Sequence, residues 1–210
     1  MVEDVKKQRA RAILRALKKL HPNAGMILKY SNPWECLVAV MLSAQCTDVM
    51  VNKVTEKLFK KYLTLDDYVE SSPREFEKDI FSTGFYRNKT KNVLAAAKMI
   101  RNEFGGEVPG TMQELLRVPG VARKTANVTL GNCYGIVEGF AVDTHVKRLS
   151  RRLGLTKQSV PTKIEKDLMA LFPQKEWFTL TYYLIEYGRA YCTAKRHNHG
   201  VCPLKRFDAL

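Results

Sequence analysis

Acidic side chains are scarce in this 210-residue sequence: 21 Asp and Glu residues stand against 35 Lys and Arg residues, giving a formal net charge of +14. A polyanionic partner fits this charge, and nucleic acid is the commonest such partner. A merely soluble basic surface, or contact with an anionic membrane, would also fit. Hydrophobic residues make up 45% of the chain, which argues against disorder.

Long apolar runs are missing as well. The longest, residues 36–42, falls far short of the roughly 20 residues that a membrane span needs, so no membrane partner is expected. Disulfide-forming cysteines are also few, because the sequence has five cysteines, an odd number. Together with the lack of a signal peptide, this indicates an intracellular protein of the cytoplasm or nucleoid.

Period-two alternation between turn signals is absent, so strands are not expected. Helix-start signals are frequent instead. They lie at Ser31-Asn32-Pro33, Thr47-Asp48, Ser72-Pro73, Asp143 and Pro161. The sequence therefore predicts an all-α protein of about ten short helices.

A short apolar helix leads into Val118-Pro119-Gly120, and a second helix is expected to begin around Val121. Glycine allows a tight turn, and the first turn of the next helix offers unpaired N–H groups and the positive end of its dipole. This helix-hairpin-helix, about residues 113–133, predicts a corner that binds backbone phosphate without reading sequence. The same corner occurs in several classes of DNA-binding protein.

Lys124 lies in the first turn of that second helix, directly after Arg123. The helix dipole, the neighbouring cation and burial would disfavour its ammonium form, and a neutral lysine is a nucleophile that can form a Schiff base. From these residues alone, a phosphate-binding lysine fits equally well. Asp143 opens a later helix and reads first as a cap, but an antiparallel return would bring its carboxylate near the amine.

Four ordered segments resemble endonuclease III of the helix-hairpin-helix DNA glycosylase superfamily, over nearly the whole chain. They are residues 42–48 together with 51–53, then 84–89, 118–127 and 141–145. The resemblance implies a bifunctional DNA glycosylase/AP lyase of base excision repair. Such an enzyme flips an oxidised pyrimidine out of duplex DNA, cleaves its glycosidic bond and nicks the strand by β-elimination.

By this resemblance Lys124 is the nucleophile and Asp143 the second catalytic residue. Gln45 would fill the gap left by the flipped base, and Phe85 would be the apolar wedge between base pairs. The remaining DNA-binding residues would be Pro119, Gly120, Val121, Ala122, Arg123, Thr144, His145, Lys195 and Arg196. Related adenine glycosylases lack the lysine, so Lys124 favours lyase chemistry.

The sequence departs from the family at Ala122, where a second glycine is common. Alanine tolerates a right-handed helical φ, so we expect one there, with intact phosphate binding. The chain otherwise leaves two alternatives to the repair activity. One is a non-enzymatic DNA-binding module, and the other is a glycosylase of shifted specificity for uracil, mismatched thymine or an oxidised purine.

Most family members end in four cysteines that hold a [4Fe–4S] cluster. Here the same spacing carries Cys192, His199, Cys202 and Asp208. Two replacements leave two thiolates, so the cluster is not expected. Zinc is possible, with His197 as a spare ligand, but a metal-free, packed tail is the first expectation. Basic residues of the tail and nearby helix are expected on DNA phosphates, namely Lys195, Arg196, His197, Lys205, Arg206, Lys147, Arg148, Arg151 and Arg152.

The resemblance also implies two helical lobes flanking a DNA-binding cleft. A monomer is expected because it suits this task. Residues 22–135 would form a six-helix barrel that includes the hairpin. Residues 1–21 and 136–210 would form the second lobe, which ends in the degenerate cluster loop 192–208. Lys124 and Asp143 would face each other across the cleft, where the base pocket is expected.

Overall fold

The computed structural model describes residues 2–209, and within them it contains helices and connecting segments but no strand. The all-α prediction is confirmed. None of the described helices combines the length and the apolar character needed to span a bilayer. The main helices are α1 (Val2–Leu20), α2 (Pro33–Leu42), α3 (Asp48–Lys61), α4 (Leu65–Glu70), α5 (Pro73–Ile80), α6 (Tyr86–Glu103), α7 (Met112–Leu115), α8 (Arg123–Thr129), α9 (Thr144–Arg152), α10 (Pro161–Leu171) and α11 (Gln174–Ala190).

The helix-start signals work through side-chain caps. Asn32 accepts a hydrogen bond from the Glu35 amide at 2.9 Å, with Pro33 as the first helical residue. Thr47 caps α3 and Ser72 caps α5 in the same way. Each cap satisfies a backbone N–H that has no partner within its helix, so these predicted starts are confirmed.

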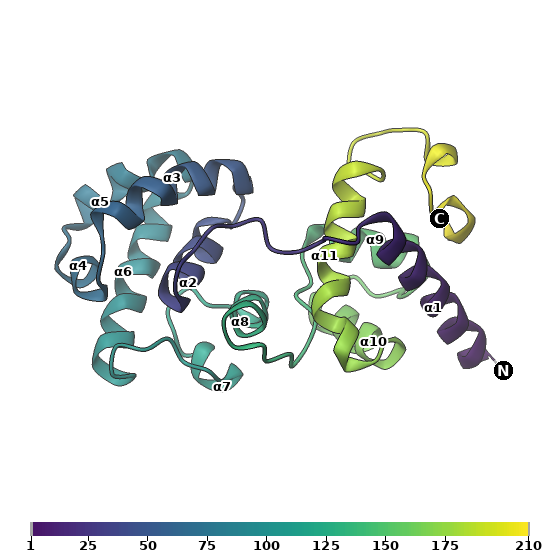
Figure 1. Cartoon of the computed structure of the whole chain (residues 1–210), viewed down its shortest axis with the longest axis horizontal. Helices are drawn as coiled ribbons and strands as arrows, with labels where there is room; N and C mark the ends of the chain where they lie inside the picture. Colours follow the sequence, from purple (N-terminus) through teal and green to yellow (C-terminus); the bar gives the residue numbers. More distant parts are fainter. Residues whose placement is uncertain (1, 210) are drawn as a thin grey trace. The chain divides into compact units, whose positions relative to one another are not determined.

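The chain divides into two compact units, which are described separately. The first, here called the hairpin unit, comprises Ile27–Ile136. Its long helix α6 packs against α4 and α5, while α2 packs against α8 (Figure 1). All residues of α2 from Cys36 to Leu42 are buried, so this short apolar helix forms the centre of the unit and supports the hairpin.

The second unit, here called the tail unit, comprises the residues up to Met26 and those from Val137 onward. Helix α11 packs against α9, α1 and α10 around a buried apolar core (Figure 1). The apolar face expected on the first helix is part of this core, with Ile13 and Leu17 fully buried. Cys192, Cys202 and Leu204 extend the same core into the tail.

The tail is ordered by two short 3₁₀ turns, η3 (His199–Val201) and η4 (Lys205–Phe207). Arg9 of α1 donates hydrogen bonds to the carbonyls of Leu153 and Phe207. The Leu204 amide donates to the Tyr187 hydroxyl at 3.2 Å, and the Ala209 amide donates to the Arg152 carbonyl. These contacts fasten the end of the chain onto its own unit.

Candidate active site and metal centre

The hairpin turn depends on Gly120, whose φ is +77°. The Val121 amide donates to the Val118 carbonyl at 3.1 Å and closes the turn. A Cβ on Gly120 would lie 2.7 Å from the Cβ of Asn92 and 2.8 Å from the Cε of Met41. Glycine is therefore required twice here, once for the left-handed backbone and once for space.

Helix α8 begins at Arg123, with Ala122 as its N-cap at φ −96° and ψ 168°. The expected helix start around Val121 and the expected helical conformation at Ala122 are both wrong. The backbone of Ala122 is extended, as N-cap residues usually are, and alanine has no side-chain oxygen to accept from the first turn. The N-cap side chain therefore does not occupy the first turn of α8, which suits phosphate binding there.

Lys124 is the second residue of α8, so it lies in the first turn as expected. Its side chain is exposed, and the expectation that burial would disfavour its charge is wrong for the protein alone. Pro119 and Arg123 beside it are half-buried, and Val121 is buried. Lys124 lies at the positive end of the α8 dipole, next to Arg123.

Gln45 and Phe85 lie in one open pocket of the hairpin unit, which Gly120 also lines. Both are exposed, and Phe85 keeps 65% of its surface accessible. Among the described residues they are the only non-glycines with a left-handed backbone, with φ of 53° and 50°. Such strain costs on the order of 1–3 kcal/mol and marks functional positions more often than chance would.

Lys89 holds together the two segments that carry Gln45 and Phe85. It is buried, and its Nζ donates to the Leu42 carbonyl at 2.7 Å and to the Thr83 carbonyl at 2.8 Å. Burial lowers the pKa of Lys89 from its ordinary value. The lysine thereby ties the end of α2, which precedes Gln45, to the turn that precedes Phe85.

Asp143 is the N-cap of α9, and its Oδ1 accepts from the Val146 amide at 2.7 Å. The half-buried carboxylate therefore has a structural task, whatever else it does. Thr144 is exposed, whereas His145 is half-buried and its Nδ1 has no hydrogen-bond partner. Burial lowers the pKa of His145, although the Asp143 carboxylate opposes this shift.

Lys124 belongs to the hairpin unit and Asp143 to the tail unit. That they face each other therefore stays a prediction. Within the hairpin unit, the structure brings together the predicted positions Gln45, Phe85 and Gly120.

The tail residues expected on phosphate are accessible to different degrees. Lys195, Arg196, Lys205 and Arg206 are exposed, as is Arg151 on α9. Lys147, Arg148 and Arg152 are half-buried. Their contact with DNA stays a prediction.

The expectation of a metal-free tail is contradicted by four side chains that converge there. Cys192, His197, His199 and Cys202 each offer a ligand atom, and these atoms lie within 4.8 Å of one another. Both cysteines are buried. Such a cluster is consistent with a metal-binding site.

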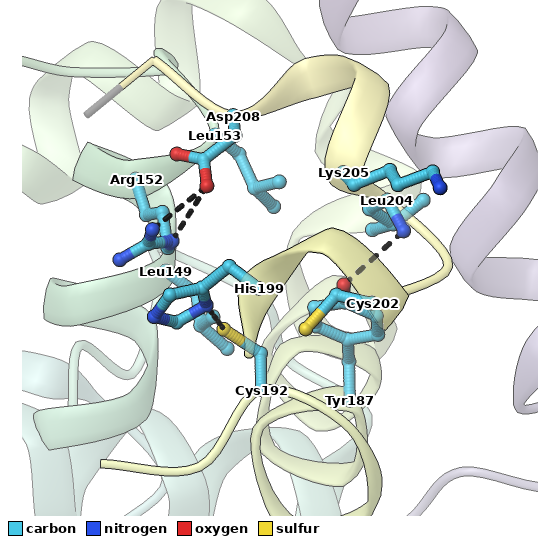
Figure 2. A pocket seen from close by; sticks show the side chains of 10 residues that line it. All are labelled: Leu149, Arg152, Leu153, Tyr187, Cys192, His199, Cys202, Leu204, Lys205 and Asp208. Carbon is cyan, nitrogen blue, oxygen red and sulfur yellow. Dashed lines mark hydrogen bonds and ion pairs between the residues drawn. The ribbon is translucent and has the colours of Figure 1, made fainter. Parts of the chain in front are cut away.

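Asp208, the fourth position of the inherited spacing, is not in this cluster. Its Oδ2 accepts from Nε and Nη2 of Arg152 at 3.1 and 2.7 Å, away from the sulfur atoms (Figure 2). His197, which sequence analysis treated as a spare, takes part instead. Its proximity to His199 in the sequence was the available signal, but only the fold of the loop decides between it and Asp208.

Comparison with known proteins decides the family. Residues 38–174 match the HhH-GPD superfamily of base excision DNA repair proteins. The chain is 53% identical over 199 residues to endonuclease III of Synechocystis sp., which covers 95% of this chain and 91% of that protein. The chain belongs to the endonuclease III family. Bacillus subtilis endonuclease III is 47% identical over 187 residues, covering 88% of this chain and 84% of that protein.

Solved structures of endonuclease III have the same fold as this family member. A trapped covalent endonuclease III–DNA intermediate superposes with a TM-score of 0.93 and 43% identity, covering 97% of this chain and 95% of that one. A non-covalent endonuclease III–DNA complex matches equally well, with the same score, identity and coverage. The resemblance read from the four sequence segments is thus confirmed.

The tail of this endonuclease III family member does not fit a four-cysteine [4Fe–4S] site. Two of the four converging residues are histidines. A cluster of four irons, each bound by its own thiolate, needs four thiolates, whereas Cys192 and Cys202 supply two.

Proposed function

We propose that this chain is a bifunctional DNA glycosylase/AP lyase that removes oxidised pyrimidines from double-stranded DNA in base excision repair. The observation that carries the proposal is the exposed Lys124 in the first turn of α8, directly after an intact Pro-Gly hairpin in an endonuclease III fold. A clamp that only bound backbone phosphate could use this lysine, but it would not also need Asp143, Gln45 and Phe85.

DNA binding follows from charge and from the hairpin. A net charge of +14 attracts the duplex before any specific contact forms. The first turn of α8, which has no N-cap side chain in front of it, can then bind one phosphate and fix the register of the strand. Phosphate contact at this point would hold the damaged nucleotide near Lys124, which lies one residue into the same helix.

Extrusion of the base is assigned to Gln45 and Phe85. Unstacking a base pair costs a few kcal/mol, and an inserted apolar side chain offsets part of this cost. Phe85 is exposed and held by a strained backbone, and Gln45 lines the same pocket. The arrangement supports a wedge at Phe85, with Gln45 filling the vacated position in the duplex.

The chemistry needs a neutral Lys124 amine. Its lone pair forms a bond to C1′ as the bond to the base breaks, and the base leaves with the electron pair and takes up a proton. The Asp143 carboxylate would stabilise the positive charge that develops on the sugar and assist proton transfer. Opening of the sugar ring gives an iminium, and loss of a C2′ proton then expels the 3′ phosphate.

Trapping the iminium with borohydride tests this assignment. The wild type should form a stable adduct on a duplex that contains one oxidised pyrimidine, and Lys124→Ala should form none while still binding the duplex. Lys57→Ala, which removes another exposed lysine of the hairpin unit, should trap like the wild type. Efficient trapping by Lys124→Ala would refute the role of this lysine.

The lesion preference is tested by the same assay with duplexes that carry uracil, mismatched thymine or an oxidised purine. Oxidised pyrimidines should react fastest.

We also propose that the enzyme works inside the cell, in the cytoplasm or nucleoid. None of the five cysteines forms a disulfide, as expected in a reducing compartment.

A further inference from the structure

The metal-ligand cluster in the tail has the dimensions of a site for a single ion. Cys192 Sγ lies 3.7 Å from His199 Nδ1, and Cys202 Sγ lies 3.5 Å from His197 Nε2. Zinc bound tetrahedrally at about 2.3 Å to sulfur and about 2.0–2.1 Å to nitrogen places those atoms about 3.5 Å apart. Both separations therefore match the edge of one tetrahedron.

Hydrogen bonds around the cluster orient the ligands. His197 Nδ1 lies 2.8 Å from the Lys195 carbonyl, to which it donates when its Nε2 carries the lone pair. Histidine ligands of metals almost always donate their other N–H to such an acceptor, which fixes the tautomer and the ring. Arg148 Nη1 donates to Cys192 Sγ at 3.7 Å and so holds this sulfur in place from the side of α9.

We propose that Cys192, His197, His199 and Cys202 bind one Zn²⁺ ion, in place of the iron–sulfur cluster of the four-cysteine relatives. Two thiolates and two neutral imidazoles form a neutral tetrahedral zinc site, a common structural type. In a two-iron cluster held by two histidines and two cysteines, both histidines bind one iron and both cysteines bind the other. Here each sulfur is instead paired with a histidine nitrogen.

The ion fastens the chain just beyond α11. Cys192 is the second residue after the end of that helix, and the other ligands come from the following loop and from η3 with its C-cap, Cys202. The ion and the Arg152–Asp208 ion pair thus hold separate parts of the tail, as Figure 2 shows for Cys192, Cys202 and Asp208. His197 takes part in the cluster, and Asp208 pairs with Arg152 instead.

Metal content is measured on the full chain after expression with both iron and zinc supplied, and after purification without oxygen so that no cluster is lost to oxidation. Elemental analysis should find one zinc per chain, without stoichiometric iron or acid-labile sulfide. Co²⁺ in place of zinc should give the intense visible absorption of a tetrahedral site and the charge-transfer band of bound thiolate. Iron with sulfide would overturn the proposal, as would a chain that binds neither metal.

Two variants separate the proposed ligands from the inherited spacing. His197→Ala should weaken zinc binding in a chelator competition by more than the about 10–100-fold that loss of an outer-shell partner causes. Asp208→Asn should bind one zinc with unchanged affinity. The opposite result, with loss on Asp208→Asn and none on His197→Ala, would assign the site to the inherited spacing instead.

A measurement on the wild type tests the site without depending on how the variants fold. Removing zinc from the wild-type chain should speed trypsin cleavage after Lys195 and Arg196, both exposed in the loop between the ligands. Restoring Zn²⁺ should reverse the change, because metal binding supplies folding energy to such loops. Cleavage that is indifferent to zinc would contradict the structural role.

Discussion

Replacing Gly120 by alanine places a methyl group where the hairpin has no room for one. The left-handed φ of +77° costs a non-glycine residue about 1–2 kcal/mol. The new Cβ would also lie 2.7 Å from the Cβ of Asn92, which sits directly on its helix backbone and cannot swing away. Overpacking of this kind costs about 1–3 kcal/mol, and alanine returns about 0.4–1 kcal/mol through the unfolded chain.

Gly120→Ala should therefore lower the free energy of unfolding of the hairpin unit by about 2–4 kcal/mol. Two matched glycines separate the causes. Gly135 has φ +66° and nothing within 4 Å of a Cβ, so Gly135→Ala should lose only about 1 kcal/mol. Gly110 also has open space and no left-handed φ, so Gly110→Ala should be neutral or slightly stabilising.

Urea unfolding followed by tryptophan fluorescence measures these losses. The chain has two tryptophans, Trp34 in the hairpin unit and Trp177 in the tail unit. On a Trp177→Phe background the signal reports on the hairpin unit alone. If Gly120→Ala lost no more stability than Gly135→Ala, the close approach of Asn92 to the turn would be refuted.

Three further changes test the site. Asp143→Asn keeps a capping side chain, so the melting temperature should not change. Base excision should fall at least about 100-fold, the usual scale for an acid–base group. Full excision activity would contradict the role of the carboxylate. Phe85→Ala should cost less than about 1 kcal/mol of stability, because Phe85 is 65% exposed. The same change should reduce the rate of base excision from duplex DNA. A stability loss near the 3–5 kcal/mol of a core phenylalanine would instead show a packing role. The pKa of Lys89 is lowered on folding, so the unfolded chain binds its proton more tightly than the folded chain does. The free energy of unfolding of the wild type, relative to that of Lys89→Met, should therefore rise between neutral pH and about pH 10. A pH-independent difference would contradict the shift.

Local chemistry made most of the helices predictable. Asn32, Thr47 and Ser72 cap helices where the sequence places them, because a cap is settled within four residues of chain. The start of α8 was misplaced because Ala122 carries no capping side chain and so gives no signal. The left-handed backbones of Gln45 and Phe85 could not be predicted from the sequence either, since neither residue type favours that region.

The proposed metal site shows where sequence spacing misleads. The inherited intervals pointed to Asp208, and the loss of two cysteines argued for a tail without metal. Ligand selection depends on how the loop after Cys192 turns, and that turn brings His197 to Cys202 while Arg152 holds Asp208. The exposure of Lys124 was missed for a related reason, since position in a helix does not determine which side chains cover it.

Mass spectrometry of the trapped adduct tests the central claim most directly. Reaction of the wild type with lesion-containing duplex under borohydride, followed by digestion of protein and DNA, leaves the sugar remnant on one peptide. The remnant should map to Lys124, in the peptide that contains the start of α8. A remnant on another lysine, or on the N-terminal amine, would contradict the assignment of Lys124 as the nucleophile.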